Sequence, residues 1–299
     1  MKNYFLLFVV ACFSATTIAQ SINDEININE ESPFLLGKIN KDGLMSENYN
    51  HWFSKNYETY ELDQATIKLL TSKLKDYNIK LFMGTWCGDS KKEVPRFYKI
   101  IEACNFPKDQ LTVIALSKKP YMYKQSPNHE EAGLNIHRVP TFIFYKDRKE
   151  VNRIVEHPIE TLEKDILNIV TKNTYKSNYQ IVETVNAILK DDGLNGLKKQ
   201  SKRLVKTYDN KVTSMYELNT YGRILYASNK LDEAIEVFKL NTQLFPDNPR
   251  TFMSLANTLG ISGYSKKAIQ TLKDAIEKFP DDNDLLENLE ALKTSINGK

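Results

Sequence analysis

Cysteine and histidine are scarce in this sequence, and their scarcity excludes two classes of protein. The chain carries 3 cysteines and 4 histidines among 299 residues. A small scaffold held together by disulfides needs a much higher cysteine content. The histidines show no ligand spacing with cysteines or acidic pairs, so we expect no metal site and no cofactor. They are His51, His129, His137 and His157.

The chain also lacks a strong charge of either sign and, after its N-terminus, a long apolar run. The formal net charge is +3, which gives no reason to expect a nucleic-acid partner. No internal run approaches the roughly 18 apolar residues of a membrane helix, so we expect no transmembrane helix in the mature chain. The basic run 198–203 is typical of the solvated face of a helix, with an anionic partner as the alternative.

The N-terminus carries the one apolar stretch that indicates a targeting signal. Lys2 precedes an apolar core from Tyr4 to Phe13, and Thr17-Ile18-Ala19 follows. This pattern is typical of a secretory signal peptide cut after Ala19. We therefore expect residues 1–19 to be removed and the protein to be exported to a bacterial periplasm. The alternative is a lipobox that makes Cys12 a lipid anchor.

Export leaves Cys87 and Cys104 in the mature chain, and they are poor disulfide partners. If residues 90–104 form one helix, a rise of about 1.5 Å per residue separates the two sulfur atoms by about 20–25 Å. We interpret Cys104 as a small buried apolar side chain. Cys87 therefore has no disulfide partner in its own chain.

Cys87 lies where a strand pattern changes to a helix pattern. The apolar run 81–83 ends at Gly84-Thr85, and Trp86-Cys87-Gly88-Asp89-Ser90 opens a segment with helical spacing. This order predicts Cys87 at a helix N-terminus, where unpaired N–H groups and the helix dipole favour a thiolate. Asp89 opposes that effect, whereas Lys91 and Lys92 support it.

The segment resembles the active-site turn of the thioredoxin family, because Trp86-Cys87-Gly88 is followed by Pro95. A second stretch, Arg138-Val139-Pro140-Thr141-Phe142, resembles the cis-proline loop of that family. The resemblance implies a thioredoxin-like α/β domain over residues 51–173, with a mixed central sheet flanked by helices. It also implies catalytic roles for Trp86, Cys87, Ser90 and Pro140, and a substrate segment that lies along Gly88 and Val139.

Three positions depart from the family pattern. The second cysteine of the motif is Ser90, the buried acidic residue is Leu81, and the glycine of the last strand corresponds to Asn152, which would contact substrate. A serine cannot attack a mixed disulfide. Release then needs a second cysteine of the client, a small thiol or a partner reductase, so isomerisation or transfer fits better than net reduction.

Periodicity predicts the elements of this domain. Residues 20–50 have the composition of a flexible N-terminal segment, with room for a small hairpin at 33–44. The predicted helices are 64–75, 90–104 and 159–170. The predicted strands are 57–62, 80–83, 111–116, 141–145 and 151–156.

After residue 178 the strand patterns end and the sequence repeats itself. Four pairs of residues are separated by the same interval: Gly222 and Ala256, Ala234 and Ala268, Phe238 and Leu272, and Pro246 and Pro280. This interval resembles the tetratricopeptide (TPR) repeat, whose period is about 34 residues. The resemblance implies an all-α helical-repeat domain over residues 178–299. Because two repeats bury too little surface, helices at 179–189 and 193–208 should pack ahead of them, and 285–296 should cap the far end.

The first helices of successive TPR repeats line a concave groove. By register, Asn219, Arg223 and Tyr226 face it from one repeat, and Met253 and Asn257 from the next. These side chains suit an extended protein or peptide partner that carries a carboxylate. The alternative is that the repeats pack against the thioredoxin-like domain.

Two functions follow from these patterns. The first is an exported thioredoxin-like thiol–disulfide oxidoreductase or isomerase, in which Cys87 acts on disulfide-containing clients held by the repeats. The second is a non-enzymatic adaptor, a degenerate thioredoxin fold joined to a peptide-binding array. Trp86, Cys87 and Pro140 favour the first function, whereas Ser90, Leu81 and Asn152 favour the second.

Overall fold

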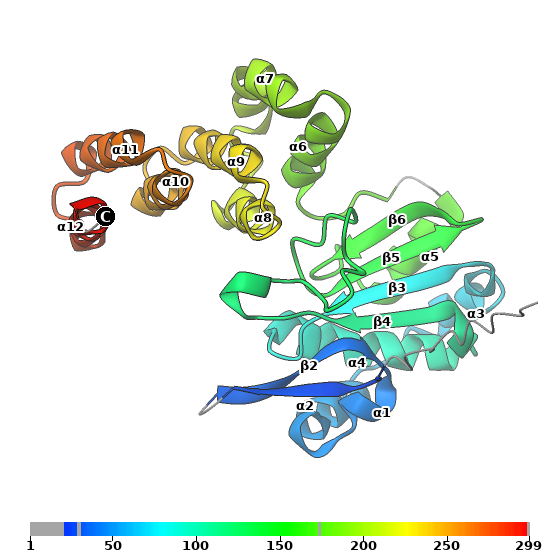
Figure 1. Ribbon diagram of the computed structural model, residues 1–299. Coiled ribbons are helices and arrows are strands. Elements are labelled where there is room, and N and C mark those ends of the chain that lie inside the picture. The colour runs from blue at the N-terminus through cyan, green and yellow to red at the C-terminus, as the bar shows by residue number, and fades with distance from the viewer. Residues whose placement is uncertain (1–20, 29–30, 173–174, 298–299) are drawn as a thin grey trace, which may run out of the picture.

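Six strands form one mixed sheet in the N-terminal part of the chain, and helices make up the C-terminal part (Figure 1). The computed structural model describes residues 21–28, 31–172 and 175–297. We call the part up to residue 172 the α/β domain and the part from residue 175 the helical array. The expected signal peptide at 1–19, with Cys12, lies outside the described residues.

The strand that leads to Cys87 lies inside the sheet, whose order is β1-β2-β4-β3-β5-β6. Neighbours β3 and β4 are parallel, and the other neighbouring pairs are antiparallel. The sheet is therefore mixed, as expected. The strands are β1 (Asp24–Ile28), β2 (Glu31–Ile39), β3 (Asn78–Met83), β4 (Leu111–Ala115), β5 (Thr141–Lys146) and β6 (Lys149–Val155).

Side chains alternate between the two faces of the sheet, and each face has its own core. Leu81 and Met83 belong to the larger core, to which the helices contribute, whereas Phe82 belongs to a smaller core with Ile114 and Val139. The segment between β4 and β5 thus covers the smaller core. The helices are α1 (Lys41–Leu44), α2 (Glu47–Glu58), α3 (Gln64–Thr71), α4 (Gly88–Ala103) and α5 (Leu162–Lys172), with short 3-10 turns η1 (Leu74–Asp76), η2 (Lys108–Gln110) and η3 (Pro120–Met122).

The expectation of a flexible segment over residues 20–50 is wrong. β1 and β2 form a hairpin there, β2 pairs with β4, and α1 and the start of α2 follow. Phe34 and Leu35 are buried, so this hairpin is part of the domain. The expected hairpin at 33–44 lies too late in the sequence, because residues 41–44 are helical.

The expected first strand at 57–62 is also wrong, because α2 continues to Glu58. Tyr49, Trp52, Phe53 and Tyr57 recur at helical spacing, and the first three are buried on one face of α2. This period of three to four residues prevails over the alternation seen from Tyr57 onward. The other predicted elements of the domain occur within a few residues, as β3 to β6 and α3 to α5.

Helix pairs repeat along the array at the period found in the sequence. α8 packs on α9, and α10 packs on α11. Gly222 lies in the first contact, where a Cβ atom would approach the Phe238 ring to 2.7 Å; Ala256 and Leu272 share the core of the second. The helices are α6 (Gln180–Asp191), α7 (Gly193–Tyr208), α8 (Tyr216–Ala227), α9 (Leu231–Leu244), α10 (Pro249–Ile261), α11 (Ser265–Lys278) and α12 (Asn283–Asn297).

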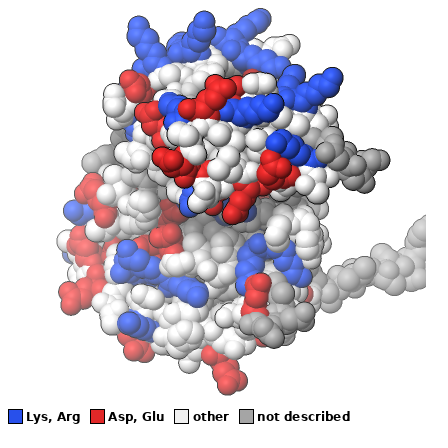
Figure 2. All heavy atoms as spheres, turned by 90° about the vertical axis from the view of Figure 1, so that its left-hand side faces the viewer, with Lys and Arg blue, Asp and Glu red and all other residues white. Residues whose placement is uncertain are grey.

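The basic run lies on α7, at the top of Figure 1, and basic side chains gather at the top of Figure 2. Leu197 and Leu204 are buried, whereas Lys198, Lys202 and Arg203 are exposed. This distribution is that of a solvated helix face, as expected for the run.

The array contacts the α/β domain through α8 and the segment 117–139, which we call the covering segment. Gln125 Nε2 donates to the Ala227 carbonyl at 2.8 Å, and Arg138 Nη2 donates to the Tyr216 carbonyl at 2.9 Å. The Arg223 guanidinium lies 4.4 Å from the centroid of the Tyr123 ring.

A second set of contacts joins the start of the array to the α/β domain, where Tyr175 Oη donates to Asp165 at 2.9 Å and Asn178 Nδ2 donates to the His157 carbonyl at 2.8 Å. Figure 2 shows a hollow between the two parts.

Candidate functional site

Cys87 is the N-cap residue of α4, as the sequence predicts. Its backbone is extended (φ −92°, ψ 130°), and its carbonyl accepts the N–H of Lys91 at 3.0 Å. The side chain is half-buried. The preceding turn depends on Gly84, where a Cβ atom would lie 2.5 Å from the Trp86 indole. A glycine there lets the indole fold back over the turn.

The structure brings Cys87, Trp86, Val139 and Pro140 together. The Cys87 thiol donates to the Val139 carbonyl, with 3.1 Å between sulfur and oxygen, and the Val139–Pro140 peptide bond is cis. Trp86 Nε1 donates to the Leu116 carbonyl at 2.8 Å. These bonds hold the turn before α4 against the residue that follows β4 and against the end of the covering segment. The backbone just before β5 therefore reaches the sulfur atom.

Ser90 and Gly88 lie in the first turn of α4 and differ in access. Ser90 is fully buried, and its Oγ accepts the N–H of Gly84 at 3.2 Å. Its hydroxyl therefore ties α4 to the preceding turn. A Cβ atom at Gly88 would meet no heavy atom within 4 Å, so space is open directly beside Cys87. Leu81, the position of the family's acidic residue, is buried in the larger core.

Asn152 does not lie in this site, contrary to the expectation. It pairs with Phe144 in the β5–β6 ladder and donates from Nδ2 to the Tyr175 carbonyl at 2.8 Å. The residue bonded to the Pro140 carbonyl is Glu156, through its backbone N–H at 2.7 Å. The position opposite the proline therefore comes later in the chain than the family pattern indicates, and the ladder also contains an irregularity after Phe144.

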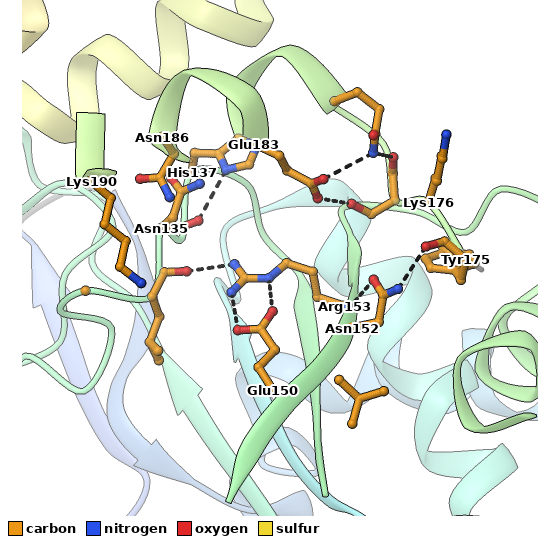
Figure 3. A pocket seen from close by; sticks show the side chains of 15 residues that line it. Asn135, His137, Glu150, Asn152, Arg153, Tyr175, Lys176, Glu183, Asn186 and Lys190 are labelled. Atoms are coloured by element: carbon orange, nitrogen blue, oxygen red, sulfur yellow. Dashed lines mark hydrogen bonds and ion pairs between the residues drawn. The ribbon is translucent and has the colours of Figure 1, made fainter. Parts of the chain in front are cut away.

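Asn152 lines a separate cavity of about 460 Å³ between β6, the covering segment and α6 (Figure 3). Arg153 spans one wall of it, bound to Glu150 at 2.6 Å through Nε and to the Leu134 carbonyl at 2.7 Å through Nη1. His137 is buried beside it, and burial lowers the pKa of its imidazole to about 3. That ring is therefore neutral at physiological pH.

The five residues expected to line the groove differ in their burial and in their contacts. Asn219 is buried and donates to Ser254 Oγ at 2.7 Å, inside the array. Tyr226 and Met253 are half-buried against the cores of the array. Arg223 lies on Tyr123, and Asn257 is exposed. Of the five, only Arg223 and Asn257 have mostly exposed side chains.

Sequence reasoning identified Val139 in the covering segment and missed the buried Lys124 of the same segment. Lys124 is 5% exposed, and its Nζ donates to the His137 carbonyl at 2.5 Å. Arg138 forms an ion pair with Glu156 at 3.1 Å. The segment has no helical or strand period, so only the resemblance at 138–142 pointed to it, and that resemblance does not extend to Lys124.

The described residues were compared with the requirements of a metal site and of a membrane-spanning helix. Within residues 21–28, 31–172 and 175–297, no cluster of three or more His, Cys, Asp or Glu side chains is arranged to hold a metal ion. In the same ranges no helix combines the length and the apolar character needed to cross a membrane.

Comparisons with known proteins show a distant likeness to formamidopyrimidine-DNA glycosylases of two Wolbachia strains. The identity is 26% over 108 residues for the enzyme of Wolbachia pipientis subsp. Culex pipiens (strain wPip). It is 25% over 108 residues for the enzyme of Wolbachia sp. subsp. Brugia malayi (strain TRS). Each match covers 34% of this chain and 40% of the relative. No family model and no solved structure matches the chain, and a likeness of this extent does not assign it to a family.

Proposed function

We propose that this protein is a thiol–disulfide oxidoreductase or isomerase of the thioredoxin-like type that acts through Cys87 alone. The observation that carries the proposal is the half-buried Cys87 thiol at the N-cap of α4, 3.1 Å from the Val139 carbonyl. A helix N-terminus favours the thiolate. The open space beside Gly88 supports access for a disulfide.

The chemistry is one exchange reaction followed by release. The Cys87 thiolate attacks one sulfur atom of a client disulfide; a bond to Cys87 forms, the client S–S bond breaks, and the second client sulfur leaves as a thiolate. Ser90 has no sulfur to resolve this mixed disulfide. Cys104 is buried at the far end of α4, and burial raises the pKa of its thiol. A thiol of the client, a small thiol or a partner reductase therefore releases Cys87.

The finer fold is part of the same proposal. The parallel pair β3–β4 with α4 after β3, and the antiparallel pair β5–β6 after Pro140, support a thioredoxin-like core. The antiparallel pairing of β2 with β4 departs from an opening βαβ unit. Helix pairs that recur at the period of the sequence repeat support TPR repeats that bind a client. Export through residues 1–19 to a periplasm completes the proposal.

The proposal predicts that the two cysteines differ sharply in reactivity. In the folded mature chain, iodoacetamide should alkylate Cys87 faster than free cysteine at neutral pH, because the helix N-terminus favours the thiolate. Cys104, which is 4% exposed, should stay unmodified until denaturant is added. The variants Cys87→Ser and Cys104→Ser assign each rate to one thiol. A Cys87 rate no higher than that of free cysteine would favour the adaptor function instead.

The proposal also predicts that Arg223 takes part in client capture. Arg223→Glu should abolish capture of the proteins that a pull-down recovers with the wild-type chain, because it repels a partner carboxylate. Thermal stability should change by only about 0.5 kcal/mol, as for other surface substitutions. The matched control is Tyr123→Leu, which removes the ring under the guanidinium but keeps the charge, and should retain capture. Unchanged capture by Arg223→Glu would assign this arginine to packing alone.

A further inference from the structure

Arg138 joins the α/β domain to two helices of the array. Its Nη2 atom donates to the Tyr216 carbonyl at 2.9 Å, at the start of α8. Its guanidinium carbon lies 4.9 Å from the centroid of the Tyr179 ring, and Tyr179 is the N-cap residue of α6. A planar guanidinium group can stack on a ring and donate hydrogen bonds in its own plane at the same time. One side chain therefore binds both helices.

Glu156 binds the guanidinium group and the tyrosine together. Nη1 of Arg138 donates to Oε1 of Glu156 at 3.1 Å, and the Tyr179 hydroxyl donates to Oε2 of the same carboxylate. The side chains of Arg138 and Glu156 are 18% and 13% exposed. A partly buried ion pair is screened by salt much less than a surface pair. The carboxylate therefore fixes Arg138 against the first helix of the array.

The same two residues flank the backbone that contacts Cys87. Arg138 directly precedes Val139, whose carbonyl accepts the Cys87 thiol with 3.1 Å between oxygen and sulfur. The backbone N–H of Glu156 donates to the Pro140 carbonyl at 2.7 Å. The ion pair thus joins the two segments of chain that hold this backbone. A displacement of the Arg138 side chain is passed to the Val139 carbonyl through a single residue.

Both side-chain partners of Arg138 have unusual backbone conformations. Glu156 and Tyr179 lie in the left-handed region, with φ of 67° and 68°. Side chains of this size seldom adopt that region, and they stay there only where the surrounding contacts fix them. Residues of this kind cluster at functional sites. The two conformations indicate that the contacts around Arg138 fix a position and do more than fill space.

We propose that Arg138 is a positioning residue that anchors the Val139–Pro140 backbone to the helical array and so holds this backbone in place beside Cys87. The inference rests on the proposed function, in which a client segment lies along Val139 while the Cys87 thiolate attacks the client disulfide. Arg138 acts through the backbone and takes no part in the exchange of bonds. The array is then part of the site, because residues of α6 and α8 determine where that backbone lies.

Replacement of Arg138 by methionine tests the inference. Methionine keeps an apolar stem and removes the ion pair, the stack and the hydrogen bond to α8. The probe is an extended peptide whose cysteine is disulfide-bonded to thionitrobenzoate, and the absorbance of the released thionitrobenzoate measures the exchange with Cys87. The rate should fall about tenfold, because a misplacement of about 1 Å by a change away from the reacting atoms costs up to about 100-fold.

Alkylation separates loss of position from loss of structure. Iodoacetamide needs the Cys87 thiolate and no peptide backbone beside it, so its rate in Arg138→Met should equal or exceed that of the wild type. The Val139 carbonyl accepts the thiol proton and thereby favours the neutral thiol, and its displacement makes Cys87 more reactive towards this reagent. Cys104 is 4% exposed and should stay unmodified. A merely structural defect would instead expose Cys104 to the reagent.

Two variants serve as controls. Gln125→Met removes another hydrogen bond between the same two parts, from Nε2 to the Ala227 carbonyl, and should leave the exchange rate unchanged. Tyr179→Phe keeps the ring and removes the hydroxyl bonded to Glu156, so its rate should lie between those of the wild type and Arg138→Met. If Arg138→Met fails to fold, Arg138→Lys takes its place. A lysine cannot stack and donate to two acceptors in one plane, so a wild-type exchange rate in this variant would overturn the inference.

The outcomes separate the inference from the function on which it rests. A wild-type protein that exchanges rapidly, with the same rate in Arg138→Met, overturns the anchoring role and leaves the proposed function intact. A wild-type protein that exchanges no faster than free cysteine defeats both. An equal loss in Gln125→Met would assign the effect to the contact between the two parts in general and overturn the particular role of Arg138. Slow exchange in Arg138→Met alone, with undiminished alkylation of Cys87 and an unmodified Cys104, supports the inference.

Discussion

Ser90→Cys should raise the turnover of a model disulfide by about tenfold or more when a dithiol reductase supplies the electrons. In the wild-type chain each mixed disulfide on Cys87 waits for a thiol from solution. Residues three apart in a helix have Cβ atoms about 5–6 Å apart, within reach of a disulfide after a small adjustment. A thiol at position 90 therefore resolves the mixed disulfide within the molecule, at a high effective concentration.

The substitution should leave the fold intact. Ser90 Oγ accepts one hydrogen bond, from the N–H of Gly84 at 3.2 Å, and a sulfur atom accepts it more weakly. The expected cost is about 1 kcal/mol. Ser90→Ala is the matched control, because it loses the same hydrogen bond and gains no thiol; its turnover should equal that of the wild type. Robust wild-type turnover without any added small thiol would contradict a site with one functional sulfur.

The part of the site that follows from local sequence could be predicted. Gly84, Cys87 and the helix after them form one continuous strand–turn–helix unit, and its geometry depends on neighbours in sequence. The contact between Cys87 and Val139 is long-range, and it was predictable only because a second stretch of sequence carried its own resemblance. Lys124 carries no such pattern, since its burial depends on how an irregular segment crosses the sheet.

Two causes explain most of the wrong predictions: the sequence does not specify the register of strand pairing, and helical and strand periodicities overlap in one stretch. Asn152 was misplaced because the residue bonded to Pro140 comes later, just after β6, and a strand pattern does not specify pairing register. The strand expected at 57–62 does not form, because the aromatic residues of α2 recur at helical spacing and the helix continues to Glu58. The hairpin of β1 and β2 was missed because the polar, acidic composition of β1 resembles that of a flexible segment.

The repeat of the helical array could be predicted from the sequence, but its contact with the α/β domain could not. The period of the sequence follows from the contacts between α8 and α9 and between α10 and α11, which recur along the chain. The contact of Arg223 with Tyr123 has no counterpart in the next described repeat, because it depends on a segment of the other domain. Internal repetition therefore says nothing about which repeat meets a neighbour.

Gly222→Val should destabilise the array by about 3 kcal/mol, which reverses the usual effect of replacing a helical glycine. A glycine in a helix interior normally costs about 1 kcal/mol relative to alanine, so propensity alone favours a side chain at this position. A Cβ atom at Gly222, however, would lie 2.7 Å from Cε1 and Cζ of Phe238. That ring is 2% exposed in the core between α8 and α9, and overpacking a filled core costs about 1–3 kcal/mol or more.

Denaturant unfolding followed by helical circular dichroism measures this cost, and two variants show its origin. Gly260→Val in α10 places a Cβ atom 2.8 Å from the Leu292 Cδ1 atom, the free end of a side chain in the last helix α12. Its cost should be near the lower end, about 1 kcal/mol. The double variant Gly222→Val, Phe238→Leu should recover part of the stability, since a smaller side chain leaves room for the new methyl groups. If Gly222→Val and Gly260→Val lose the same free energy of unfolding, the close approach of α8 and α9 is not the reason why position 222 requires a glycine.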